Sequence, residues 1–152
     1  MTDSQKTDQE LLSSFIESGQ QASFTELVYR HESLVMGVCY RILENRQDAQ
    51  DAAQSTFIQL ATKARKLKSA GTIAPWLYTV ARQKALDSLK ARTRRTNRLQ
   101  KEKERIMNEN RPSVKLTSDE VELSQTIDAA VGELPKLYRD VIVLHYLQEN
   151  NY

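Results

Sequence analysis

Apolar residues recur along most of this chain at the three- and four-residue spacing of an α-helix, and little interrupts them. Only four Gly and three Pro occur among the 152 residues, and aromatic residues make up 7% of the chain. Gln, Glu, Lys, Arg, Ala and Leu dominate, which are residues that favour helices over strands. The sequence therefore predicts an all-α fold.

The helical spacing of apolar residues, together with helix start and stop signals such as Gly and Pro, divides the chain into six expected helices. These span residues 9–18, 23–44, 46–67, 72–98 or beyond, 119–131 and 135–148. The stretch "NENRPSVKLTS" between the fourth and fifth helices is polar and typical of a linker. We therefore expect a four-helix domain over 1–98, a charged linker over 99–118 and a helical segment over 119–152.

The fourth expected helix has two different faces when its residues are placed at 100° intervals. One stripe is apolar and carries small side chains that allow close helix packing: Leu77, Ala81, Ala85 and Leu89. The opposite stripe is polar: Thr79, Gln83, Asp87, Lys90 and Arg94. Because uncharged hydrogen-bonding groups begin the polar stripe well before the arginine run, we interpret this helix as both a core element and a binding surface.

Charge is strongly divided along the chain. Residues 1–62 hold four Lys/Arg and nine Asp/Glu, a net charge of −5, and residues 106–152 hold four and eight, a net charge of −4. Residues 63–105 hold fourteen Lys/Arg and three Asp/Glu, a net charge of +11. A basic block of this kind is typical of a surface that binds nucleic acid, although Lys/Arg runs also simply solvate exposed helices.

The third expected helix carries two carboxylates and an apolar residue opposite its core stripe. Asp48, Asp51, Ser55, Ile58 and Thr62 share this face. A projecting Ile beside carboxylates suits a protein interface better than a DNA groove. The alternatives are an ordinary solvated face whose Asp residues favour the helix N-terminus, and a nuclease site, for which no third clustered carboxylate is present.

Several classes of site find no support in the sequence. A single cysteine, Cys39, excludes an internal disulfide, and with two distant His residues it leaves no zinc-type spacing. We expect Cys39 and His31 to be structural and Trp76 to be a packing residue. No metal, cofactor or catalytic residue is predicted. The N-terminus is too polar for a secretion signal and no apolar run could span a membrane, which predicts a cytoplasmic protein without membrane contact.

Four stretches of the chain resemble a known family. They are "FTELVYRHESLVMGVCYRIL", "QDAQDAAQSTFIQLATKA", "APWLYTVARQKALDSLKARTRR" and "AAVGELPKLYRDVIVLHYLQ". In this order, they resemble the extracytoplasmic-function (ECF) group of bacterial RNA polymerase sigma factors. The resemblance implies a helical sigma region 2 domain over 1–98 and a sigma region 4 segment over 119–152, and a role in promoter recognition and opening during transcription initiation.

The resemblance implies that the third helix binds core RNA polymerase, at the clamp coiled coil of the largest subunit. The residues expected to make this contact are Asp48, Asp51, Gln54, Ser55 and Ile58. Promoter DNA, including its non-template single strand, is the second implied partner. An anti-sigma factor is a possible third partner, and it would compete for the polymerase surface.

The resemblance also implies that the loop before the fourth helix captures an unstacked base, and that the helix itself faces DNA. The loop candidates are Lys68, Ser69, Gly71 and Thr72. The helix candidates are Thr79, Arg82, Gln83, Lys84, Asp87, Lys90, Arg92, Arg94 and Arg95.

The C-terminal part departs from the family pattern, because the sequence stops at Tyr152 before a turn and recognition helix. We therefore expect an incomplete sigma region 4. The run "VIVLHYL" is apolar nearly all round, so we expect the last segment either to be poorly ordered or to be buried against the first domain or a second copy, with the stretch 138–147 in the core. The alternative function is a helical interaction module that uses its basic helix to bind an acidic partner.

Overall fold

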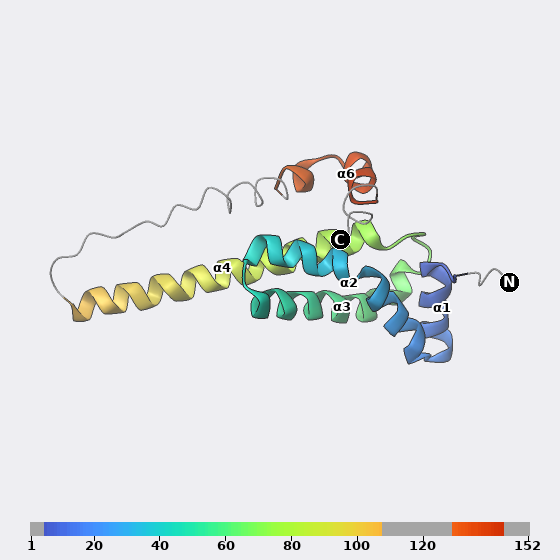
Figure 1. The fold of residues 1–152 in the computed structure, drawn as a ribbon, viewed down its shortest axis with the longest axis horizontal. Helices are drawn as coiled ribbons and strands as arrows, with labels where there is room; N and C mark the ends of the chain where they lie inside the picture. Colours follow the sequence, from blue (N-terminus) through green and yellow to red (C-terminus); the bar gives the residue numbers. More distant parts are fainter. Residues whose placement is uncertain (1–4, 108–128, 145–152) are drawn as a thin grey trace.

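The structure is a computed structural model that describes residues 5–107 and 129–144 (Figure 1). Within those residues every regular element is helical, which confirms the predicted all-α class. The helices are α1 (Asp8–Ser18), α2 (Gln21–Leu43), α3 (Arg46–Leu67), α4 (Ala74–Ile106) and α6 (Lys136–Ile142). None of the helices in this part of the chain combines the length and apolar character needed to cross a membrane.

Local sequence signals fix the ends of α1. The Thr7 side chain accepts from the Glu10 N–H, and the Glu10 carboxylate accepts from the Thr7 N–H, so the two residues form a capping box. At the other end Gly19 has a φ of 62°, its N–H donates to the Phe15 carbonyl at 3.1 Å, and the Gln20 N–H donates to the Ser14 carbonyl at 3.5 Å. Glycine tolerates this left-handed conformation without a Cβ penalty, so the helix stops there and α2 begins two residues later.

A two-residue connection reverses the chain between α2 and α3. Glu44 ends α2 in a left-handed conformation with a φ of 50°, and its N–H donates to the Tyr40 carbonyl. Asn45 then caps α3, because its side chain accepts from the Asp48 N–H at 3.0 Å. The short connection lets α2 and α3 pack side by side along most of their length (Figure 1).

The core lies where α2, α3 and α4 pack against one another, with α1 against α2 and α3. One apolar stripe from each helix supplies it, and Leu77, Ala81 and Ala85 of the predicted α4 stripe are buried. The buried residues of the other two stripes are Leu27, Val35, Val38 and Ile42 from α2 and Ala49, Ala53, Leu60 and Ala64 from α3. Trp76 and Leu89 are partly buried and pack against the same cluster. The predicted packing role of Trp76 is therefore confirmed, as are the buried positions of His31 and Cys39.

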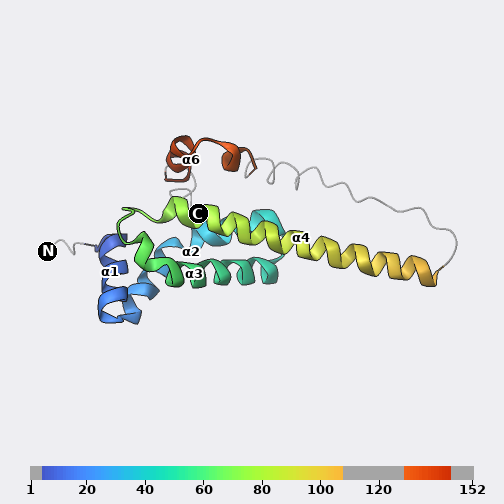
Figure 2. The same ribbon diagram turned by 180° about the vertical axis from the view of Figure 1, so that it is seen from behind.

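The α4 helix continues far past the bundle, as Figures 1 and 2 show. It reaches Ile106, so residues 99–106, which the sequence assigned to the linker, are helical. Every residue from 93 to 107 is exposed. The C-terminal part of α4 is thus a solvated, strongly basic rod attached to a packed N-terminal part.

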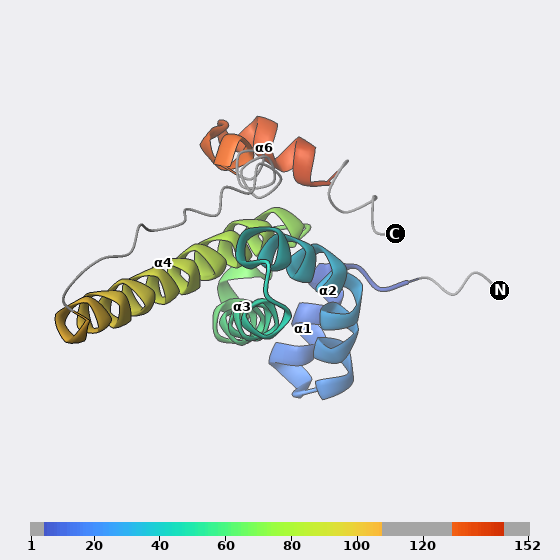
Figure 3. The same ribbon diagram turned by 60° about the vertical axis from the view of Figure 1, so that its left-hand side comes forward.

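A C-terminal segment lies against the N-terminal part of α4 (Figures 2 and 3). Residues 129–133 are helical and are followed by α6, while positions 119–128 and 145–148 of the two predicted helices lie outside the described residues. Val131 and Val143 are buried in the main core cluster. Tyr138 and Val141 are 62% and 55% exposed, so the expectation of burial is wrong at these two positions. A two-turn helix has one face on the domain and leaves its other face to solvent.

Candidate functional site

The polar stripe of α4 (Thr79, Gln83, Asp87, Lys90, Arg94) is exposed along its whole length. The Gln83 side-chain amide donates to the Asp87 carboxylate at 3.0 Å, and the Thr79 hydroxyl donates to the Pro75 carbonyl at 3.1 Å. The first pair lies one turn apart, so each side chain holds the other along the helix surface. The stripe therefore presents ordered polar groups that lead into the exposed basic residues Arg94 and Arg95.

Arg82 lies differently from the rest of the predicted DNA-binding set. It is half-buried, and a Cβ at Gly132 would come within 2.6 Å of its guanidinium carbon, so the side chain packs on the backbone of the C-terminal segment. The Arg82 Nε is buried and has no hydrogen-bond partner among the described residues. In this arrangement the C-terminal segment covers part of Arg82, whereas Lys90 remains exposed and Lys84 is half-buried.

Arg92 connects the two predicted surfaces. One guanidinium nitrogen donates to the Asp48 carboxylate at 3.1 Å and to the Leu43 carbonyl at 3.1 Å. The sequence assigned Arg92 to phosphate and Asp48 to polymerase, but here each is the other's partner. Both side chains are more than 30% exposed, so the ion pair contributes little to stability and mainly fixes the position of α4 against the start of α3.

The loop between α3 and α4 keeps its four candidates, Lys68, Ser69, Gly71 and Thr72, exposed. Gly71 has a φ of 78°, a conformation that side chains disfavour, and it turns the chain toward α4. Lys68 forms an ion pair with Glu17 of α1. Gly71 and Thr72 face Thr7 and the first two residues of α1 across an open hollow of about 270 Å³.

A second, wider hollow of about 800 Å³ continues from the same loop over α1. It is lined by Lys6, Gln9, Glu10, Ser13, Ser14, Arg65, Lys68 and Ser69. Three of these residues are cationic, namely Lys6, Arg65 and Lys68. Lys6 and Arg65 were not predicted from the sequence as binding residues. Their positive charge could have suggested them, but nothing in their spacing indicated that α1 lies beside the end of α3.

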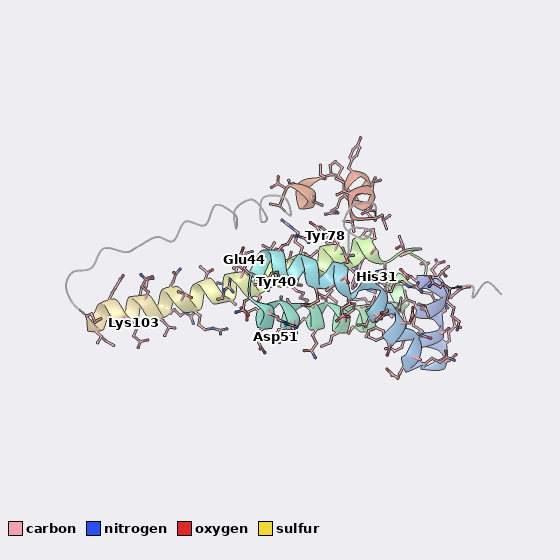
Figure 4. All side chains as sticks on the ribbon, in the orientation of Figure 1. His31, Tyr40, Glu44, Asp51, Tyr78 and Lys103 are labelled. Atoms are coloured by element: carbon pink, nitrogen blue, oxygen red, sulfur yellow. The ribbon has the colours of Figure 1, made fainter. Side chains whose placement is uncertain are left out.

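The α3 surface consists of Asp51, Gln54, Ser55 and Ile58, all exposed on the side away from the core. Ile58 is 61% exposed, and Asp51 points outward from α3 in Figure 4. An exposed apolar side chain gains by burial against another protein. Four of the five residues predicted to bind polymerase thus share one accessible face, and Asp48 lies at its edge, paired with Arg92.

A buried polar cluster at Asp8 was not predicted. The Asp8 carboxylate accepts from Arg30 at 2.9 Å and pairs with the His31 Nε2 at 2.9 Å. It also accepts from the Ile73 N–H at 3.5 Å. The sequence indicated that His31 lies on the core side of its helix (Figure 4), but the identity of its partner was not readable from periodicity.

The environment of Asp8 favours its ionised form. Burial alone raises the pKa of the Asp8 carboxyl, but the hydrogen bond and electrostatic attraction of His31, with the hydrogen bonds from Arg30 and the Ile73 N–H, lower it below its ordinary value. A group with a lowered pKa in the folded state stabilises the fold at pH values above its unfolded pKa, which for Asp is about 3.9. That contribution is lost as the pH falls through the lower, folded pKa.

We expect Asp8→Asn to reduce the free energy of unfolding near neutral pH, and the gap between wild type and variant to shrink as the solution is acidified below about pH 4. Urea unfolding of both proteins across that pH range measures the gap directly. All other carboxylates are present in both proteins, so their effects on the pH dependence of the free energy of unfolding cancel in the difference between wild type and variant. A gap that stayed constant into acid would show that the Asp8 charge does not contribute.

The last groups to place are the possible metal ligands and the Cys39 thiol in the described part of the chain. No group of three or more His, Cys, Asp or Glu side chains there could hold a metal ion. Burial raises the pKa of the Cys39 thiol to about 12, and the thiol sits 3.9 Å from the Ala81 carbonyl. Cys39 is therefore a protonated packing residue between α2 and α4.

Comparison with known proteins agrees with this geometry. The Sigma-70 region 2 profile matches residues 27–95, which run from α2 through α3 into α4. The ECF RNA polymerase sigma factor SigW of Bacillus subtilis is 28% identical over 143 residues, which cover 88% of this chain and 75% of that protein. The ECF RNA polymerase sigma factor SigE of Mycolicibacterium smegmatis is 31% identical over 134 residues, covering 86% of this chain and 51% of that protein.

A third relative, the RNA polymerase sigma-H factor of Pseudomonas aeruginosa, is 31% identical over 91 residues, which cover 60% of this chain and 47% of that protein. The chain thus spans three quarters of one of these relatives and about half of the other two. The profile match falls on the helices that carry the α3 surface and the polar stripe of α4. Residues 27–95 therefore match Sigma-70 region 2, and over most of its length the chain is similar to extracytoplasmic-function RNA polymerase sigma factors.

Proposed function

We propose that this chain binds core RNA polymerase through the α3 surface and directs promoter recognition and opening through the α3–α4 loop and the polar stripe of α4. The observation that carries the proposal is the two-faced α4, whose buried stripe joins the bundle while its exposed stripe leads into a basic rod. The α3 surface differs from it in chemistry, being acidic and apolar. Two surfaces of different chemistry on one small bundle suit two different partners.

The α3 surface is suited to a protein partner of basic and apolar character. We propose that this partner is the clamp coiled coil of the largest polymerase subunit. Ile58 of α3 would make the apolar contact with it, and Asp51 would supply the charge. The Asp48–Arg92 pair would then keep the DNA-facing helix in a fixed position relative to that docking site. An anti-sigma factor that covered the α3 surface would exclude polymerase.

Promoter opening would follow from differential binding. A protein that binds an extruded base and a single strand more tightly than duplex DNA shifts the equilibrium toward the open form. We propose that the α3–α4 loop receives the base of the non-template strand at the 270 Å³ hollow. Lys68, Ser69, Gly71 and Thr72 would form the loop side of this site, and the cations of α4 would hold phosphates.

The remaining expectations complete the proposal. The chain acts without catalytic activity or a cofactor of its own, in the cytoplasm where RNA polymerase works. Residues 1–98 serve as sigma region 2, and residues 119–152 correspond to the start of sigma region 4, with α4 extending into the linker. The match to Sigma-70 region 2 and the similarity to sigma factors favour transcription initiation over the alternative of a plain interaction module.

The test of the proposal is strand preference in the presence of polymerase. The full chain is mixed with purified bacterial core polymerase, and the complex selects from a pool of short single strands of randomised sequence. We expect the complex to bind the selected strands more tightly than the same sequences as duplex, and core polymerase alone to show no such selection. An interaction module would give no strand selection with or without polymerase.

We also expect the Arg94→Gln, Arg95→Gln double variant to weaken the salt dependence of DNA binding. Each phosphate contact contributes about −0.9 to the slope of log K against log salt, so losing two contacts makes the slope less negative by roughly 2. The control is Arg46→Gln with Lys63→Gln, which removes the same charge from α3. Equal changes in slope for the two variants would mean that net charge, and not α4, determines DNA binding.

A further inference from the structure

The carboxylate of Asp8 joins three separate parts of the domain. It lies in the first turn of α1, it contacts Arg30 and His31 of α2 at 2.9 Å each, and it accepts from the Ile73 N–H at the end of the α3–α4 loop. Asp8 is 8% exposed, and Ile73 and His31 are 0% and 1% exposed. The contact therefore holds the loop to α1 from inside the domain.

The N-terminus of α4 depends on this contact because it has no cap of its own. Ile73 occupies the N-cap position, and its side chain offers no acceptor for the first N–H groups of the helix. Asp8 supplies a carboxylate to this position from a different helix, where negative charge is favoured by the helix dipole. The conformation at the loop's end is thus set by a residue about 65 positions away along the chain.

Asp8 also lines the 270 Å³ hollow. Thr7, Asp8 and Gln9 form one wall, and Gly71 and Thr72 form the other. The hydrogen bond from Ile73 to Asp8 ties the two walls together directly behind the exposed loop residues. Loss of that bond frees the loop wall to move relative to α1.

We propose that Asp8 is a positioning residue for strand capture: it fixes the α3–α4 loop against α1 in the shape that receives the unpaired base, and Arg30 and His31 hold the carboxylate in place. This inference rests on the proposed function of the loop. Asp8 itself does not need to touch DNA, because it acts through the backbone at Ile73.

The experiment compares Asp8→Asn with Val38→Ala in the full chain bound to core polymerase. Val38 is buried in α2 and takes no part in the Asp8 cluster, so its truncation lowers stability without affecting the loop directly. Three quantities are measured: affinity for core polymerase, affinity of the complex for the selected single strands, and hydrogen exchange at the Ile73 amide.

We expect Asp8→Asn to keep its polymerase affinity, to bind the selected strands about tenfold more weakly, and to exchange the Ile73 amide faster. Val38→Ala is expected to change none of these under conditions where it is folded. Equal strand affinities in the two variants would overturn the inference. If the wild-type complex selects no strands, the proposed function is wrong and this inference is wrong with it. If the wild type selects strands and Asp8→Asn binds them equally well, only the inference is wrong.

A second variant reaches the same loop without touching the Asp8 cluster. An added Cβ at Gly71 meets nothing within 4 Å, but the φ of 78° is unfavourable for alanine, so Gly71→Ala alters only the loop backbone. We expect the same loss of strand affinity with unchanged polymerase affinity. Unchanged strand binding by folded Gly71→Ala would show that loop shape does not govern capture, which also overturns the inference.

Discussion

An Asp51→Arg, Ile58→Glu double variant is expected to fold like the wild type and to bind core RNA polymerase roughly a hundredfold more weakly or worse. Both side chains are exposed, so replacing them costs little stability beyond a small effect of Arg near the α3 N-terminus. At a protein interface the same changes reverse a charge and bury a new one at the apolar contact. The effect on binding should therefore far exceed the effect on folding.

The measurement is the affinity of labelled full-length chain for purified bacterial core polymerase, with circular dichroism and urea unfolding to verify the fold. Lys63→Glu is the matched control, because it is exposed on α3 but lies about 120° or more around the helix from Asp51 and Ile58. We expect the control to bind like the wild type. Comparable affinities for the double variant and the control would exclude the α3 surface as the docking site.

The helices themselves were largely predictable, because local signals and the apolar period agree. The predicted range 46–67 matches α3, where Asn45 caps the helix and the loop with Gly71 follows it. The α4 helix runs to Ile106, which agrees with the predicted end at 98 or beyond, because Lys, Arg, Glu, Gln and Leu continue to that point without Gly or Pro. Its buried and exposed stripes follow the prediction.

The polar contacts were not predictable, because a helical period assigns a residue to a face without naming its partner. Arg92 and Asp48 are 44 positions apart, and His31 and Asp8 are 23 apart. Arg92, Asp48 and His31 were each placed on a helix and Asp8 was not placed at all, and only the packing of α4 on α3 and of α1 on α2 brings the pairs together. Arg82 was assigned to DNA through the family resemblance, while its packing on Gly132 depends on a segment 50 residues away.

The two faces of α4 lead to the prediction with the largest effect on stability. Leu77 is fully buried in the core cluster, and we expect Leu77→Ala to lower the free energy of unfolding by about 2–5 kcal/mol, through lost burial and the cavity it leaves. Domains of this size are stable by only about 5–15 kcal/mol, so a large part of the total would be lost. Urea unfolding followed by circular dichroism measures the change.

Thr79→Ala is the matched control, since Thr79 lies two residues further along the same helix but on the polar stripe, and is exposed. Its stability should stay within about 0.5 kcal/mol of the wild type, while strand binding by the polymerase complex weakens about threefold through loss of one hydroxyl contact. Leu77→Ala, at temperatures where it is folded, should keep wild-type strand binding. If both variants lowered the free energy of unfolding, or both weakened strand binding, the core and the DNA surface would not be separate stripes of α4. The basic rod would then be a solvated extension of the bundle.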